Sequence, residues 1–120
     1  MFTPIDRLPL GVLGVEAHGR ITSKDRSGVL SPRIDSARKL GSKVKLLYVT
    51  GADFVGYDQG GVFDDAVFGT RHFTDFERIA FVSDEGPHAR AVEELDGLMP
   101  ATIRRFGRRD VDAAKAWLAE

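Results

Sequence analysis

The stretch from Val44 to Thr50, VKLLYVT, decides the fold class of this chain. After Lys45 it is nearly all apolar, which is typical of a central strand that is covered on both faces. Strands of this kind occur chiefly in sheets that carry helices on both faces. The stretch therefore predicts an α/β fold.

Further strands are expected before and after this central one. Leu10 to Ala17 alternates as a strand does, and a short strand, Arg20 to Thr22, is expected to pair with it across the turn at His18 and Gly19. Arg78 to Ser83, RIAFVS, predicts a second buried strand. Thr102 to Phe106, TIRRF, predicts a further strand that is more polar and therefore lies nearer an edge of the sheet.

The first helix is marked by its start, its face and its end. Thr22 and Asp25 have the spacing of a capping box, and Gly41 is a stop signal. Its apolar face is formed by Leu30, Ile34 and Ala37. Pro32 disrupts a helix interior, so we expect the helix either to kink there or to restart with Ser31 as its cap.

Three more helices are expected between and after the later strands. Two cover Gly61 to Phe68 and Pro87 to Met99, and the last begins at Asp110 as its cap. The last helix is expected to bury Val111, Ala114 and Leu118. Short connections between alternating elements favour parallel strands, and the antiparallel start makes the sheet mixed. We therefore expect a single α/β domain over residues 1–120, with a mixed, mostly parallel sheet of about four to five strands.

The composition is that of a globular protein and excludes several classes. The 120 residues include 17 basic and 18 acidic side chains, so no global field attracts nucleic acid or an anionic membrane. The absence of cysteine excludes disulfides, thiolate zinc sites and cysteine nucleophiles. No signal-peptide pattern is present, and no apolar run approaches the ~20 residues of a membrane span. We expect a cytoplasmic protein without a nucleic-acid partner.

Acidic residues crowd the region after the central strand: Asp53, Asp58, Asp64 and Asp65. The last two fall in the first turns of an expected helix, where carboxylates complement the helix dipole. An enzyme that used Asp53, Asp58 and His72 would need these groups to converge in space. No nucleophile elbow, Walker loop or dinucleotide motif is present. We therefore expect no catalytic residue and no cofactor.

The histidines and the arginine run also favour ordinary structural roles. The three histidines share no metal-ligand spacing, so we expect no metal site, and His18 is expected to be a turn residue. The run RRFGRR, residues 104–109, lacks surrounding aromatic residues for stacking on bases and is expected to be a solvated face.

The loop after the central strand, VTGADFVGYDQGG (residues 49–61), combines glycines with aromatic residues. Five of the eight phenylalanines fall between residues 54 and 76. Much of this cluster is expected to be core, but it exceeds what one short amphipathic face needs, and the excess suits a pocket or a dimer contact. Ligand sites in α/β folds lie beyond the carboxyl ends of the strands, where this loop begins. The candidate ligand-binding residues are Phe54, Tyr57, Phe63 and Val67.

Five segments follow one another over nearly the whole chain: GRITSKD, KLLYV, DFVGYD, DFERIAFVSD and IRRFGRRDVDAAKAWLAE. Their order resembles the SpoIIAA-like family, small bacterial domains related to STAS domains, the fold of the anti-sigma-factor antagonists. The resemblance implies a mixed sheet flanked by alternating helices, similar in topology to lipid-binding CRAL-TRIO domains. It implies no enzymatic activity.

In regulatory STAS domains the loop after the central strand carries Asp-Ser-Ser/Thr-Gly, and a partner kinase phosphorylates a hydroxyl group there. The resemblance matches Asp53 and Gly56 to the ends of that motif, while Phe54 and Val55 occupy its hydroxyl positions. Neither side chain accepts phosphate, so a phospho-switch is not expected. Thr50, the other hydroxyl close by, is expected at the strand end rather than at a helix start.

The leading hypothesis is a non-enzymatic, STAS-like domain that binds a small apolar or amphipathic ligand beside the loop after the central strand. The alternative is a protein-interaction or regulatory module, which could be a homodimer, docking a partner through the same surface. Both hypotheses use the surface around Phe54 and Tyr57.

Overall fold

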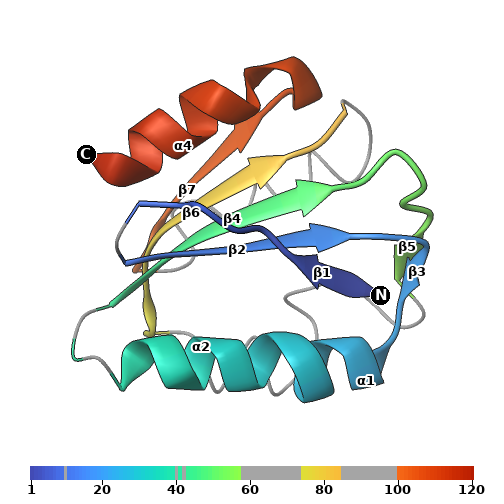
Figure 1. Cartoon of the computed structure of the whole chain (residues 1–120), viewed down its shortest axis with the longest axis horizontal. Helices are drawn as coiled ribbons and strands as arrows, with labels where there is room; N and C mark the ends of the chain where they lie inside the picture. Colours follow the sequence, from blue (N-terminus) through green and yellow to red (C-terminus); the bar gives the residue numbers. More distant parts are fainter. Residues whose placement is uncertain (10, 40, 42, 58–73, 85–99) are drawn as a thin grey trace.

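The computed structural model describes residues 1–9, 11–39, 41, 43–57, 74–84 and 100–120. Its main feature is a five-stranded sheet with the strand order β1-β2-β4-β6-β7. Figure 1 shows the strands side by side, with a helix above and a helix below the sheet. The strands are β1 (Phe2–Pro4), β2 (Val12–Ala17), β4 (Val44–Thr50), β6 (Phe76–Val82) and β7 (Thr102–Phe106).

The β4 strand is the central strand of this sheet, as its apolar sequence predicts. It pairs in parallel with β2 on one side and with β6 on the other, and β6 pairs in parallel with β7. The more polar β7 lies at the edge of the sheet, as expected. The α/β class and the mixed, mostly parallel sheet are therefore confirmed.

The antiparallel start of the sheet is formed by a segment that the sequence did not reveal. β1 pairs antiparallel with β2, with Phe2 opposite Ala17. The expected hairpin of residues 10–17 with 20–22 is wrong, because β1 occupies that edge of β2 and Gly19, at φ 60°, turns the chain away. β3 (Arg20–Ile21) instead pairs in parallel with β5 (Gly56–Tyr57) in a separate two-stranded sheet beyond the arrowheads of β2 and β4 (Figure 1).

The first helical segment begins as the capping box predicts. The backbone N–H of Thr22 donates to Asp25 Oδ2 at 2.9 Å, and the N–H of Asp25 donates to Thr22 Oγ1 at 3.1 Å. The segment comprises α1 (Ser23–Asp25), a π-helical turn (Arg26–Leu30) and α2 (Ser31–Arg38). Its carboxyl end is marked by Gly41 at φ 101°, whose N–H donates to Arg38 O at 3.0 Å.

The chain stays helical through Pro32, and the expected restart capped by Ser31 does not occur. Leu30, just before α2, has helical dihedral angles, and no side chain caps α2 at that point. A proline lacks the N–H group that an interior helix position donates, and here the wider π-helical turn directly precedes it. The helix thus passes the proline by a local change of helical type.

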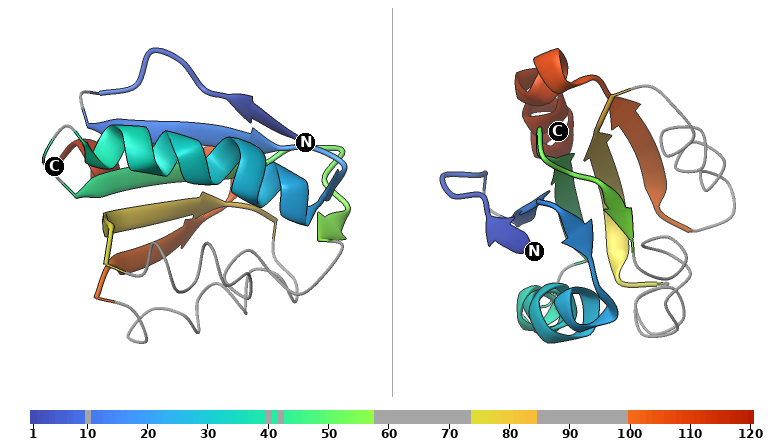
Figure 2. Two further views of the ribbon diagram at one scale, coloured as in Figure 1. Left: turned by 90° about the horizontal axis from the view of Figure 1, so that it is seen from below. Right: turned by 90° about the vertical axis from the view of Figure 1, so that its right-hand side faces the viewer.

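The last helix, α4 (Val111–Ala119), lies on the face of the sheet opposite to α2 (Figures 1 and 2). It follows a 3-10 turn, Arg108–Asp110, in which the N–H of Asp110 donates to Gly107 O. The helix begins where the sequence predicts, but the expected cap is wrong, because the Asp110 side chain makes no capping hydrogen bond. The helices expected over residues 61–68 and 87–99 lie outside the described residues.

Two apolar clusters hold these layers together, one on each face of the sheet. On the α2 face, Leu30 and Ile34 pack with Tyr48 and Phe81, and on the α4 face, Ala114 and Leu118 pack with Leu47, Ala80 and Val82. Successive residues of β4 therefore enter opposite clusters, which explains why nearly every position in VKLLYVT is apolar. Full burial of a large apolar side chain contributes about 1.5–3 kcal/mol.

Candidate functional site

The loop after β4 is held against the turn that follows β2. The N–H of Gly51 donates to Ala17 O at 2.8 Å, and the N–H of Gly19 donates to Asp53 O at 3.1 Å. The N–H of Val55 donates to Gly19 O at 2.9 Å, and the β3–β5 pairing continues this contact. Residues 51–57 thus form a docked loop at the carboxyl edge of the sheet.

Gly51 lets this loop approach the neighbouring chain closely. A Cβ atom at this position would lie 3.0 Å from Ala17 O, from Asp53 Oδ1 and from His18 Nδ1. One of these atoms belongs to the backbone of β2, which cannot move without disturbing the sheet. The glycine is therefore required by packing rather than by a special φ angle.

His18 is more than a turn residue, because its ring connects three segments. Nδ1 lies 2.9 Å from Asp53 Oδ1, and Nε2 lies 3.0 Å from Thr3 Oγ1 and 3.4 Å from Glu16 Oε2. The hydrogen bond from His18 holds the pKa of the Asp53 carboxyl below its usual value, although Asp53 is largely exposed. The imidazole therefore joins β1, β2 and the docked loop.

The order hydroxyl, imidazole, carboxylate in Thr3, His18 and Asp53 resembles a catalytic relay, but the surroundings do not suit one. Glu16 Oε2 lies 3.4 Å from Nε2, the nitrogen that would have to act as the base, so a carboxylate shares this nitrogen with the Thr3 hydroxyl group. The neighbouring backbone N–H groups already donate to carbonyl oxygens: those of His18, Gly19, Gly51 and Val55. None of these four N–H groups is therefore free to bind an oxyanion.

Of the four candidate ligand-binding residues, only Phe54 has its side chain in the described part of the chain. Phe54 is half-buried and packs against the α2-face cluster, whereas Val55 is 68% exposed. Tyr57 contributes its backbone to β5, and its side chain lies outside the described part, as do Phe63 and Val67. Asp58 and His72, needed for the enzyme hypothesis, also lie outside it.

Thr50 ends β4, as expected, and its hydroxyl group points into the structure. Only 3% of the residue is exposed, and Oγ1 donates to Val82 O at 3.1 Å. A kinase needs an exposed hydroxyl group, so the buried Thr50 is not accessible for phosphorylation in this structure.

A pocket of about 430 Å³ opens at the carboxyl edge of the sheet, between the sheet and the start of α4. Its apolar walls are formed by Ile5, Val49, Val82 and Val111. The docked loop contributes Gly51 and Ala52, and charged side chains complete the lining: Glu16, Arg108 and Lys115. Volumes of 300–1,000 Å³ are typical of sites for small molecules. We call it the edge pocket.

Sequence reasoning placed a pocket beside this loop but did not find these walls. Val49 and Val82 come from neighbouring strands in register, and Val111 comes from the first turn of α4. The only signal in the sequence is that each is the last or first apolar residue of its element. Without the strand pairing, that signal does not show that they meet.

Arg108 is part of this pocket, although the arginine run was expected to be a solvated face. Nη2 donates to Gly51 O at 2.8 Å, and Nε lies 3.3 Å from Asp84 Oδ2. Nε is buried and has no hydrogen-bond partner among the described residues. Arg104 keeps an exposed position, where its guanidinium lies over the Phe106 ring at 5.1 Å. The expectation for this run is therefore wrong for Arg108, and also for Arg105, which is half-buried and donates from Nη1 to Ser83 O at 3.2 Å.

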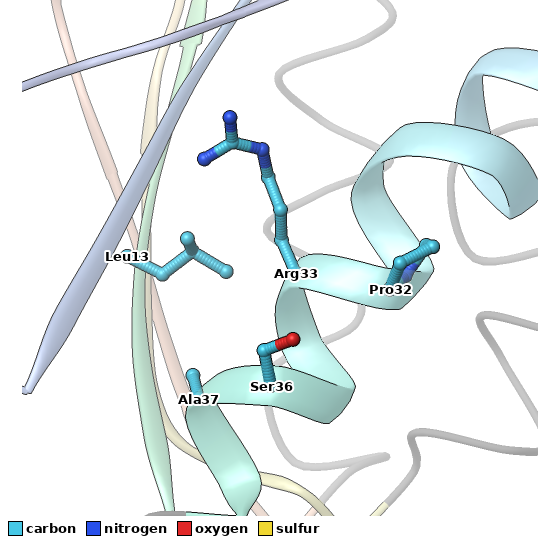
Figure 3. Close-up of a pocket in the computed structure, with 5 residues that line it drawn as sticks. All are labelled: Leu13, Pro32, Arg33, Ser36 and Ala37. Atoms are coloured by element: carbon cyan, nitrogen blue, oxygen red, sulfur yellow. The ribbon is translucent and has the colours of Figure 1, made fainter.

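A second pocket, of about 450 Å³, lies between α2 and the amino end of β2 (Figure 3). Its lining residues are Leu13, Pro32, Arg33, Ser36 and Ala37, and Figure 3 shows the Arg33 side chain extending away from α2. It lies on the opposite face of the sheet from the edge pocket, and at the other end of β2. The docked loop does not contribute to it.

The described residues contain neither a metal-binding cluster nor a helix suited to crossing a membrane. This part of the chain contains no group of three or more histidine, aspartate or glutamate side chains that could hold a metal ion. Among its helices, none has the length and apolar content needed to cross a membrane.

The mixed five-stranded sheet, the helices on its two faces and the docked loop at its carboxyl edge define a small α/β domain of the SpoIIAA-like type. The sequence model of the SpoIIAA-like family matches residues 12–119, and the chain belongs to this family. The recognition made from the five segments is thus confirmed.

A solved structure that is similar to this chain shows the same fold. It is an uncharacterised protein with a SpoIIAA-like fold from Shewanella loihica, similar with a TM-score of 0.74 and 21% sequence identity. The similarity covers 98% of this chain and 92% of that one. At this identity the likeness concerns the fold alone. A comparison with curated proteins found no match.

Proposed function

We propose that this chain is a non-enzymatic domain that binds a small apolar or amphipathic ligand beside the loop after β4. The observation that carries the proposal is the edge pocket, which lies at the carboxyl ends of β2, β4 and β6. Ligands of open α/β sheets bind outside the carboxyl ends of the strands. The apolar walls and the few charged side chains of the pocket match the usual lining of such sites.

Two groups of side chains are candidates for the ligand contacts. The first is the apolar wall of the edge pocket, represented by Val49 and Val111. The second is the set proposed from the sequence: Phe54, Tyr57, Phe63 and Val67. The second group belongs, in the sequence, to the loop after β4 and to the segment that follows it, so single variants of each group distinguish the two sets.

Native mass spectrometry of the protein isolated from its host tests this proposal. We expect a bound small molecule, which Val49→Ser weakens because it places a hydroxyl group in the apolar wall. Val29→Ser, a change at a side chain that is exposed on the helical segment, serves as the control and keeps the ligand. Circular dichroism establishes that both variants are folded. If the wild-type protein from its host carries no bound molecule, the proposal is wrong.

Loss of the ligand in Tyr57→Ala or Phe63→Ala, with Val49→Ser unaffected, would assign binding to the aromatic group instead of the edge pocket. Loss in both sets would mean that one site spans the loop.

A second candidate function is homodimerisation through the docked loop, favoured by the exposed Val55. An apolar side chain that is 68% exposed on a loop held in place by backbone hydrogen bonds suits a protein contact. Light scattering is expected to show a mass that rises with concentration and that Val55→Ser or Tyr57→Ala abolishes. A mass that stays monomeric at all concentrations contradicts this candidate.

A further inference from the structure

We propose that the ligand of the edge pocket is a small amphipathic carboxylate, whose charged group is bound by Lys115 and Arg108 and whose apolar part lies on the valine walls. This inference rests on the proposed function and adds the chemical class of the ligand.

The first argument is the charge of Lys115. Lys115 is half-buried in the lining of the pocket, and it makes no ion pair or hydrogen bond within the described residues. The other two charges of the lining have neighbours of opposite or complementary character: Glu16 lies beside His18, and Arg108 lies beside Asp84. Lys115 is therefore the lining charge for which a ligand would supply the missing partner.

The second argument is the hydrogen bonding of the Arg108 guanidinium, which is held in place but uses few of its donors. Its Nη2 hydrogen bond to Gly51 O fixes the side chain in the pocket wall. Among the described residues that bond is its sole hydrogen bond, although a guanidinium carries five N–H donors. A fixed guanidinium with free donors is suited to a carboxylate, which it can meet with two parallel hydrogen bonds.

The third argument selects a singly charged group over a phosphate. Glu16 lines the same pocket, and Asp84 lies 3.3 Å from Arg108, so the site already holds negative charge. These carboxylates would repel the second negative charge of a phosphate monoester more than the single charge of a carboxylate.

The fourth argument concerns the rest of the ligand. Ile5, Val49 and Val111 are partly buried against the α4-face cluster and leave part of their surface to the pocket, which the buried Val82 also lines. An alkyl chain covering these side chains removes apolar surface from water on both partners. A ligand that is charged at one end and apolar at the other therefore satisfies both parts of the lining.

Isothermal titration with octanoate, octan-1-ol, octylammonium and octyl phosphate tests the assignment, since these probes share one chain and differ in the head group. Octanoate is expected to bind about tenfold more tightly than octanol, and octylammonium most weakly. Added salt should weaken octanoate binding and leave octanol binding unchanged, because only the first involves an ion pair.

Variants of Lys115 locate the head group. Lys115→Met is expected to weaken octanoate binding by about three- to tenfold and octanol binding by less than about twofold. Lys115→Arg keeps the charge and should retain most of the affinity. Lys39→Met, at an exposed lysine just after α2, removes the same charge far from the pocket and should change nothing.

Three outcomes overturn the inference in different ways. If octanol binds as tightly as octanoate and Lys115→Met has no effect, the assignment of a carboxylate head group is wrong, while the proposed binding function stands. If octyl phosphate binds more tightly than octanoate, the selection for a single charge is wrong. If no probe binds and the protein from its host carries no ligand, the inference and the proposed function fall together.

Discussion

At the scale of single residues, Gly51 and His18 show how the docked loop is held. Gly51 is a glycine because three atoms lie 3.0 Å from the position of its missing Cβ. His18 bridges the loop to β1 and β2 through Asp53 and Thr3. Neither role is visible in the sequence, where Gly51 is one of four glycines around a turn and His18 is an isolated histidine.

Gly51→Ala is expected to destabilise the protein by about 1–3 kcal/mol, the usual cost of forcing an extra carbon into a packed position. Urea unfolding followed by circular dichroism measures the effect. Gly28→Ala is the matched control, because nothing lies within 4 Å of its Cβ position and it is in the helical segment. There we expect a gain of about 0.5–1 kcal/mol. Equal effects at the two positions would contradict the close approach at Gly51.

The lowered pKa of Asp53 predicts an acid-dependent contribution to stability. Because the folded-state pKa lies below the unfolded value of 3.8, the contribution is complete above that pH and is lost as the pH falls through the folded-state pKa. The stability difference between the wild type and Asp53→Asn should therefore be present at neutral pH and shrink below pH 3.8. Asp6→Asn, at an exposed carboxylate outside the loop, is the control. A difference that is constant with pH would exclude the hydrogen bond from His18 as its cause.

At the scale of elements, the helical segment after β3 shows both the strength and the limit of local signals. The capping box at Thr22 and Asp25 and the stop at Gly41 were predicted correctly, because each depends on neighbours within a few residues. The passage through Pro32 was not, because the sequence gives no signal for the π-helical turn that precedes the proline. The prediction that the Asp110 side chain caps α4 was also wrong. A 3-10 turn that the sequence did not indicate directly precedes this helix.

Thr22→Ala should cost about 1 kcal/mol of unfolding free energy, because it removes the hydroxyl group that accepts from the Asp25 N–H. Thr22→Ser retains that group and is expected to stay within about 0.5 kcal/mol of the wild type. Thermal or urea unfolding compares the two. If the serine variant is as unstable as the alanine variant, the threonine methyl group and not the cap is responsible.

At the scale of the whole molecule, Arg108 connects the segment after β7 with the loop after β4. Its Nη2 bond to Gly51 O joins residues 57 positions apart in the chain. The loop is thus tied on one side to β2 through Ala17 and on the other to the start of α4 through Arg108. The edge pocket lies between these two attachments.

Arg108→Ala is expected to speed hydrogen exchange of the loop amides at Gly51 and Val55, because the loop loses its attachment on the α4 side. Amides in the middle of β4 should keep their protection, since the sheet pairing is unchanged. Arg109→Ala, at the exposed neighbouring arginine, is the control. Nuclear magnetic resonance resolves the individual amides. Unchanged exchange at the loop amides would show that the Gly51 contact does not restrain the loop.

The sequence by itself determined the α/β class, the central position of β4, the edge position of β7 and the capping of the first helix. These properties depend on the composition and period of short segments, which a single sequence displays. The tertiary structure decided which strand pairs antiparallel with β2, that Arg108 turns inward, and that Val49, Val82 and Val111 share a pocket with Lys115. These contacts join residues that are distant in the chain, and only strand pairing and helix packing bring them together.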